Sequence, residues 1–250
     1  MDLLETSSSL KQRHPWELSR CRFFSNLLKR SGVIRKSDRW LDIGSGDAWF
    51  SDQLIGRFGE AISILCWDKE YHPGHAPASP LEHPTRISFT QEQPSEMFDG
   101  IFMLDVLEHV ENDRDFLLSI VSQNLKAGGF LLASVPAWPT LFSYHDKELK
   151  HFRRYRPREG RQVLESAGLK ILRRGGLFHA LLVPRLVNVL REKAGHVPPE
   201  HRHLGNWNRG RSVTRLVTWG LDMDNLGSRA FARLGWNIPG LSWWALCQKS

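Results

Sequence analysis

The chain has 250 residues, of which 41% are hydrophobic and 24% are charged, and these proportions are typical of a globular protein with one large domain. Its three cysteines form no CxxC pair, and no apolar run reaches the roughly 18 to 20 residues that cross a bilayer, so a disulfide framework, a zinc knuckle and a transmembrane helix are excluded. The formal net charge of +7 favours anionic partners such as nucleic acid, phosphate groups or an anionic membrane face. The scattered cysteines predict a reducing cytoplasm, and the first residues lack the basic start and apolar stretch of a signal peptide.

Residues 1–37 are predicted to form a helical segment that precedes the main domain. Apolar residues recur at helical spacing between residues 10 and 31, and Gly32 offers a stop. A short apolar strand, RWLDI at 39–43, follows and ends in a glycine-containing turn. The helix after this turn has one apolar face and is predicted to end at Gly59.

Strands and helices then alternate along the chain. Further strands are predicted at 61–67, 86–90, 98–105, 130–136, 169–176 and 241–249, and further helices at 113–126 and 158–168. Between 72 and 84, four prolines predict an extended loop where the alternation would place a helix. The pattern predicts an α/β fold with a mostly parallel sheet and helices on both of its faces.

The turn after the first strand holds Asp42, Gly44 and Gly46. Glycine lets the backbone turn sharply and lets a ligand approach where a Cβ would collide. The turn does not complete GxGxxG, because Trp49 stands in the position of the third glycine. An acid two residues before the first glycine favours a ligand with an ammonium group, since a carboxylate repels a pyrophosphate.

Asp68 closes the second strand, where an acidic side chain can accept hydrogen bonds from both hydroxyls of a ribose. Together with the glycine turn, it favours a nucleoside that carries a positive tail and no phosphates. S-adenosylmethionine has this structure.

Four stretches, WLDIGSGDAWF, WD at 67–68, FDGIFMLDVLEHVENDRDFL and LKAGGFLLASVP, resemble the core of class I S-adenosylmethionine-dependent methyltransferases over about residues 38–180. The resemblance implies a Rossmann-like domain over 38–250, with a mostly parallel seven-stranded sheet and an antiparallel last strand. It also implies methyl transfer, with S-adenosylhomocysteine as the product.

The matching positions imply roles for individual residues. Asp42, Gly44 and Gly46 would cradle the methionine part, and Asp68 would hold the ribose. Gln91 or Glu92 would accept a hydrogen bond from the adenine amino group, in place of the aspartate that the family often has there. The other expected cofactor residues are Arg20, which would reach the methionine carboxylate, Ser45, Lys69, and the wall formed by Leu104, Asp105 and Val106.

The segment after the fifth strand, 137–157, is the expected substrate loop, and its LFSYHDKELKHFRRY resembles a pattern of a bacterial subgroup of this family. HPWELSR, near the N-terminus, resembles that subgroup too. We expect His145, oriented by Asp146, to be a general base. The further catalytic candidates are His151 and Tyr155, and the candidates for binding an anionic part of the acceptor are Arg153 and Arg154. The alternative is that His151, Arg153 and Tyr155 only lock the loop onto the sheet.

DVLEHV places Asp105, Glu108 and His109 at a spacing that could gather three metal ligands at a helix start. Some quinone-pathway O-methyltransferases carry a similar acidic pair and histidine and use a divalent ion. We assign no metal here, because the helix dipole favours a glutamate at an N-terminus in any case.

Two later segments have alternative interpretations. The apolar segment 177–190 is expected to pack beneath the sheet; alternatively, with Arg185, Arg191 and Lys193, it forms an apolar and basic platform for an amphiphilic acceptor or a membrane surface. Residues 191–212, rich in His, Pro, Arg, Gly and Asn, are expected to be an irregular insertion or a mobile cover.

The expected acceptor is a small molecule or a lipid- or sugar-linked metabolite. RNA is the alternative acceptor, favoured by the basic charge but not by any separate nucleic-acid-binding module. A cofactor-binding scaffold without turnover is the non-enzymatic alternative. The sequence does not indicate an oligomeric state.

Overall fold

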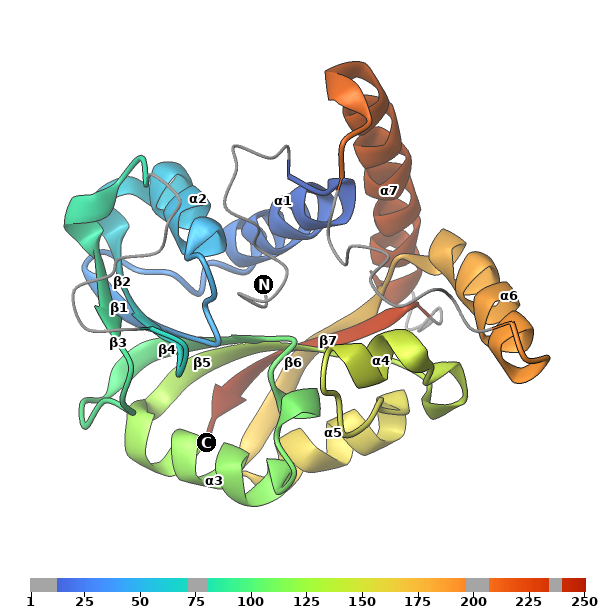
Figure 1. Ribbon diagram of the computed structural model, residues 1–250. Helices are drawn as coiled ribbons and strands as arrows, with labels where there is room; N and C mark the ends of the chain where they lie inside the picture. The colour runs from blue at the N-terminus through green and yellow to red at the C-terminus, as the bar shows by residue number, and fades with distance from the viewer. Residues whose placement is uncertain (1–12, 72–80, 197–206, 234–239) are drawn as a thin grey trace.

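The computed structural model describes residues 13–71, 81–196, 207–233 and 240–250, which fold around one seven-stranded sheet (Figure 1). The strands are β1 (Asp38–Ile43), β2 (Ile62–Trp67), β3 (Ile87–Thr90), β4 (Phe98–Leu104), β5 (Leu125–Pro136), β6 (Leu169–Leu177) and β7 (Ser242–Lys249). The helices are α1 (Pro15–Ser31), α2 (Trp49–Phe58), α3 (Asp113–Asn124), α4 (Tyr144–Glu148), α5 (Pro157–Ser166), α6 (Leu182–Lys193) and α7 (Gly210–Arg233).

The strand order is β3-β2-β1-β4-β5-β7-β6, and β7 runs antiparallel to both of its neighbours. The parallel pairs β1–β2 and β1–β4 bring the carboxyl ends of these strands to one edge. The order reverses between β1 and β4, which is where ligands bind in open α/β sheets. The predicted Rossmann-like sheet with an antiparallel last strand is confirmed.

Buried apolar side chains cover both faces of the sheet. One core cluster joins α1 and α2 to the strands, and the other joins α3 and α5 to the opposite face. Cys21, Cys66 and Cys247 are buried free thiols. The sheet is therefore enclosed between helices, as its nearly continuous apolar strands require.

Helix α1 has well-defined ends. His14 and Glu17 form a capping box around Pro15 at the first turn, and Gly32 ends the helix with a φ of 64°. The predicted helix is thus present, and the part of residues 10–31 that the structure describes as helical begins at Pro15.

Some element boundaries differ from those predicted. The helix predicted at 113–126 ends at Asn124, because Leu125 already pairs with Phe98 as the first residue of β5. The expected loop at 72–84 lies partly outside the described residues, and its last residue begins a 3-10 turn, Pro84–Arg86.

The segment 177–190 packs beneath the sheet only at its start, where Leu177 and Phe178 join the buried core cluster that contains residues of α1 and α2. After the end of β6 the chain forms α6, and Val189 is the buried residue of that helix. Helix α6 covers the first three residues of the expected insertion and α7 the last three, while 197–206 lie outside the described residues. In Figure 1, α6 and α7 project beside the β6 and β7 side of the sheet. No helix of the described residues is both long and apolar enough to cross a membrane.

Candidate active site

Two glycines shape the turn between β1 and α2. Gly44 and Gly46 have φ angles of 65° and 56°, a region that residues with a Cβ rarely adopt. A Cβ on Gly44 would lie 2.8 Å from the Cγ2 atom of Val106. The ends of β1 and β4 can therefore approach this closely because position 44 carries no side chain.

Asp68 lies against this turn. Its Oδ2 atom accepts a hydrogen bond of 2.9 Å from the backbone N–H of Gly46. Tyr71, which was not among the predicted site residues, donates its hydroxyl to the carbonyl of Gly46 at 2.7 Å and lies 2.8 Å from the hydroxyl of Ser45. Asp68, predicted to bind the ribose, and the predicted glycine turn thus lie together at the carboxyl ends of the strands.

Asp42 is buried at the base of the turn and accepts a 2.6 Å hydrogen bond from the hydroxyl of Ser51 in α2. Burial raises the pKa of Asp42 to about 6, although the Ser51 hydrogen bond opposes this shift. The carboxyl group is therefore mostly ionised at pH 7 and can attract a cationic group.

Asp105 follows β4 and has a φ of 58°, which is uncommon for a residue with a side chain. Its carboxylate forms an ion pair with Arg20 of α1 and accepts a 2.8 Å hydrogen bond from Ser134. Burial alone would raise the pKa of Asp105, but Arg20 and Ser134 hold it below its usual range. Arg20, expected at the methionine carboxylate, is thus anchored at the end of β4, beside Leu104 and Val106.

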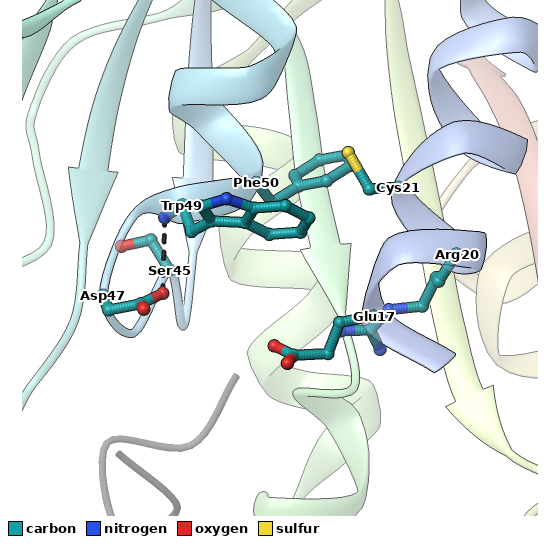
Figure 2. A pocket seen from close by; sticks show the side chains of 7 residues that line it. All are labelled: Glu17, Arg20, Cys21, Ser45, Asp47, Trp49 and Phe50. Atoms are coloured by element: carbon teal, nitrogen blue, oxygen red, sulfur yellow. Dashed lines mark hydrogen bonds between the residues drawn. The ribbon is translucent and has the colours of Figure 1, made fainter. Parts of the chain in front are cut away.

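A pocket lies between α1 and the start of α2 (Figure 2). Its lining residues are Glu17, Arg20, Cys21, Ser45, Asp47, Trp49 and Phe50. Arg20 and Ser45 were predicted site residues, and the other five were missed. Their position beside the quoted motifs was the available signal, since Glu17 lies within HPWELSR and Asp47 directly follows Gly46.

Gln91 and Lys69 lie side by side beyond β3 and β2. The side-chain amide of Gln91 donates a 3.1 Å hydrogen bond to the carbonyl of Lys69, and Trp67 donates to the carbonyl of Gln91 at 3.0 Å. Both predicted residues are exposed at the edge that carries the glycine turn.

Asp146 is the centre of a buried ionic network in the loop 137–157. Its carboxylate accepts hydrogen bonds from Arg154 at 2.7 Å, from Arg185 of α6 at 2.5 Å and from the backbone of Ser143 at 2.9 Å, and it lies 3.0 Å from Nδ1 of His151. Burial opposes ionisation, but His151 and the two arginines hold the pKa of Asp146 well below its usual range. The Asp146 carboxyl group therefore stays ionised and joins the loop to α6.

Asp146 orients His151, whereas we expected it to orient His145. Residues 145 and 146 are consecutive in α4, so their side chains leave the helix in different directions. Burial, together with the nearby Arg185, lowers the pKa of His145 to about 4. The His145 ring is therefore neutral at pH 7.

The other predicted loop residues contact protein groups. Tyr155 donates its buried hydroxyl to Asp113 at 2.7 Å, and burial followed by this hydrogen bond raises its pKa above the usual range. Arg153 lies 3.3 Å from the same Asp113 carboxylate, and Arg154 is buried against Asp146. These contacts fit the locking role that the sequence left as the alternative.

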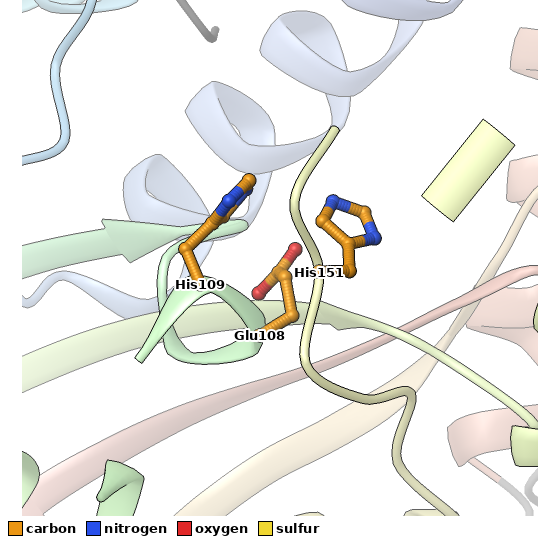
Figure 3. Close-up of side chains that lie close together, drawn as sticks. All are labelled: Glu108, His109 and His151. Carbon is orange, nitrogen blue, oxygen red and sulfur yellow. The ribbon is translucent and has the colours of Figure 1, made fainter. Parts of the chain in front are cut away.

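A second buried carboxylate lies close to the first network. Glu108 belongs to a 3-10 turn, Leu107–His109, and neither of its carboxylate oxygens has a hydrogen-bond partner among the described residues. Ligand atoms of Glu108, His109 and His151 all lie within 4.8 Å of one another (Figure 3). Burial, and then the nearby Asp105, raises the pKa of Glu108 well above its usual range. The group expected from DVLEHV thus contains His151 in place of Asp105.

Solved structures share this fold at low sequence identity. A SAM-dependent methyltransferase from Archaeoglobus fulgidus is 16% identical with a TM-score of 0.51, over 92% of this chain and 94% of that one. Phosphoethanolamine N-methyltransferase 2 of Haemonchus contortus, solved with S-adenosyl-L-methionine, is 18% identical with a TM-score of 0.53, over 98% of this chain and 55% of that one. The cyclase SpnF is 16% identical with a TM-score of 0.56, over 99% and 89%. Since a cyclase has the same fold, these likenesses do not assign a reaction.

No curated protein matches the chain significantly, but a family of protein domains does. Residues 15–174, more than half of the chain, match the methyltransferase domain family. The matched part contains α1, the glycine turn, Asp68 and the loop 137–157. The chain therefore belongs to this family of methyltransferases.

Proposed function

We propose that the protein transfers the methyl group of S-adenosylmethionine to a lipid-linked acceptor presented at an anionic membrane surface. The observation that carries this proposal is the outward-facing apolar surface of α6 and α7, of which α6 contacts the loop 137–157.

Helix α6 presents an apolar stripe to solvent. Its members are spaced three and four residues apart and are between 40% and 68% exposed: Val183, Leu186, Val187 and Leu190. An ordinary surface helix turns such a stripe toward the core. The orientation of α6 therefore favours a partner on its outer side.

Helix α7 has the same inverted arrangement. Its buried side chains include the polar residues Thr214, Thr218, Asn225 and Ser228, and its exposed ones include Val213, Leu216, Val217, Trp219, Met223 and Leu226. Asn225 donates to Ser19 of α1 at 3.1 Å, and Ser228 donates to the carbonyl of Gly176 at 2.8 Å. Because hydrogen bonds hold the polar face inward, the apolar face is left outside, and exposed apolar surface of this kind marks an interaction site.

The charges of the two helices select an anionic partner. Three carboxylates have partners within the protein: Glu192 accepts from the backbone of Tyr144, Asp222 pairs with Arg22, and Asp224 accepts from the backbone of Ala180. Among the side chains of these helices that the structure describes, the exposed basic ones are Arg191, Lys193, Arg211 and Arg215. Apolar stripes flanked by basic residues are typical of helices that lie in the interface of an anionic bilayer.

Helix α6 also places this surface beside the expected acceptor loop. Arg185 donates to the carbonyl of Leu141 at 3.3 Å and to Asp146, so α6 and the loop 137–157 are held together. A lipid-linked acceptor on α6 would have its head group near His145. The neutral ring of His145 is our candidate proton acceptor, and alignment of the acceptor with the methyl group would supply much of the rate.

Co-sedimentation with lipid vesicles tests the surface. We expect the protein to sediment with phosphatidylglycerol-containing vesicles at low salt and much less with phosphatidylcholine alone. Leu190→Glu should weaken vesicle binding by at least about tenfold, since it puts a charge into the apolar contact. Leu118→Glu on α3 is the matched control, because Leu118 is 51% exposed and Leu190 56%. Equal binding by both variants, or no binding by the wild type, would contradict the proposal.

Methyl transfer identifies the acceptor. The protein is incubated with a membrane extract and with S-adenosylmethionine labelled in its methyl group. We expect the label to be transferred to lipid, which is recovered in the organic phase of an extraction. Label in RNA would instead support the nucleic-acid alternative. Tight cofactor binding without any labelled product would support the scaffold alternative.

A further inference from the structure

Glu108 differs from the other buried carboxylates of the site. Asp42, Asp105 and Asp146 each accept at least one hydrogen bond, whereas among the described residues no group donates to either oxygen of Glu108. A buried carboxyl without a partner is costly and rare in folded proteins. Its position beside two histidines points to a ligand that the carboxylate binds.

The three side chains converge from two elements. Glu108 and His109 come from the turn after β4, and His151 comes from the loop 137–157 (Figure 3). The rings of His109 and His151 have their centroids 4.6 Å apart and are nearly perpendicular. Donor atoms bound to one ion at about 2.1 Å lie about 3 to 4 Å apart, so atoms within 4.8 Å need only small side-chain rotations to share an ion.

His151 is already oriented as a metal ligand would be. Its Nδ1 atom faces the carboxylate of Asp146, which places the proton on Nδ1 and leaves the lone pair on Nε2. The backbone N–H of Phe152 donates to the carbonyl of Glu108 at 2.8 Å, which fixes the loop against the turn. A carboxylate that orients a histidine in this way is a common support of metal sites.

We propose that Glu108, His109 and His151 bind one divalent transition-metal ion beside the cofactor site. One carboxylate oxygen and two imidazole nitrogens favour Zn²⁺, Co²⁺, Fe²⁺ or Mn²⁺ over Mg²⁺ and Ca²⁺, which prefer oxygen ligands. Three protein ligands leave coordination positions open. This use of the ion rests on the proposed function: an oxygen atom of the acceptor takes one of these open positions, next to Asp105.

Calorimetric titration of chelator-treated protein with Zn²⁺, and the visible absorption of added Co²⁺, test the site without acceptor or vesicles. We expect one equivalent of Zn²⁺ to bind, and Mg²⁺ not to displace Co²⁺. Glu108→Gln keeps the shape of the side chain and should weaken Zn²⁺ binding by more than about 100-fold, the upper end for groups that only orient a ligand. His145→Gln is the matched control from the same loop and should bind Zn²⁺ as the wild type does.

Two results would overturn the metal site: no Zn²⁺ binding by the wild type, or undiminished Zn²⁺ binding by Glu108→Gln. Thermal unfolding and S-adenosylmethionine titration of each variant establish that it is folded. Because metal binding is measured apart from vesicle binding and methyl transfer, failure of the metal site and failure of the proposed function give different results.

Discussion

The proposed cofactor side and the proposed acceptor side of this site are built by different means. On the cofactor side, backbone geometry dominates: Gly44 and Gly46 have positive φ angles, and Asp68 accepts a hydrogen bond from the backbone N–H of Gly46. On the acceptor side, side chains from separate elements meet in a buried ionic network around Asp146. The first side should therefore be most sensitive to added atoms, and the second to removed ones.

Removing the carboxylate of Asp146 should have the largest effect. Asp146→Ala leaves Arg154 and Arg185 without their buried anion, and breaking a buried ion pair in this way costs about 3 to 5 kcal/mol. Urea denaturation measures the loss. Asp222→Ala removes a more exposed ion pair, with Arg22, and should cost less than about 1 kcal/mol. Similar losses in the two variants would remove the distinction between the network and an ordinary surface pair.

Adding a methyl group to Gly44 tests the cofactor side. In Gly44→Ala the new Cβ meets Val106 at 2.8 Å, and the positive φ is unfavourable, so we expect a loss of about 1 to 3 kcal/mol in stability and weaker S-adenosylmethionine binding. The double variant with Val106→Ala should recover part of both. Gly220→Ala in α7 meets nothing within 4 Å and should be neutral or stabilising. Undisturbed cofactor binding by Gly44→Ala would argue against a tight turn.

The affinity for S-adenosylmethionine should depend on pH through Asp42. Since burial raises the pKa of Asp42 to about 6, lowering the pH below 6 neutralises the carboxyl group expected to attract the ammonium group. Affinity should then fall by up to about tenfold per pH unit, between pH 6 and 5. Titration of Asp42→Asn should show weak and pH-independent binding over this range. A wild-type affinity that is constant from pH 7 to 5 would show that the Asp42 carboxylate does not contribute to ligand binding.

Tyr155→Phe sharpens the comparison within the loop and should have the smallest effect. It removes one hydroxyl that donates to Asp113, so we expect a loss of about 1 kcal/mol in thermal or urea unfolding. A fall in kcat of the fully folded variant, with no change in stability, would instead support the catalytic role considered for Tyr155.

The cofactor side was largely predictable from sequence because its contacts follow local patterns. The glycine turn, Asp68 and the end of β4 come directly after apolar strands, and parallel pairing brings those strand ends together. The helix ends at Gly32 and Gly59 were predictable for the same reason. Tyr71 was missed because its contact with Gly46 has no sequence pattern.

The acceptor side was less predictable because its contacts are distant in sequence. Arg185 contacts Asp146 from α6, and His151 lies near Glu108 although it comes from another element. Sequence spacing alone instead suggested His145 as the partner of Asp146 and Asp105 as the partner of Glu108. Helix α7 was not predicted. Sequence spacing alone does not show that the apolar face of this helix, which includes Leu216, points outward while Thr214 and Asn225 are buried.

The most direct test of the account is calorimetric titration of the wild type, Asp68→Ala and Glu70→Ala with S-adenosylmethionine. Glu70 is the control because its carboxylate lies two residues away and is half exposed. The account predicts binding by the wild type and Glu70→Ala, and a loss of about 10- to 100-fold in Asp68→Ala, as expected when hydrogen bonds to a charged group are removed. No binding by the wild type, or equal affinity in Asp68→Ala, would contradict it.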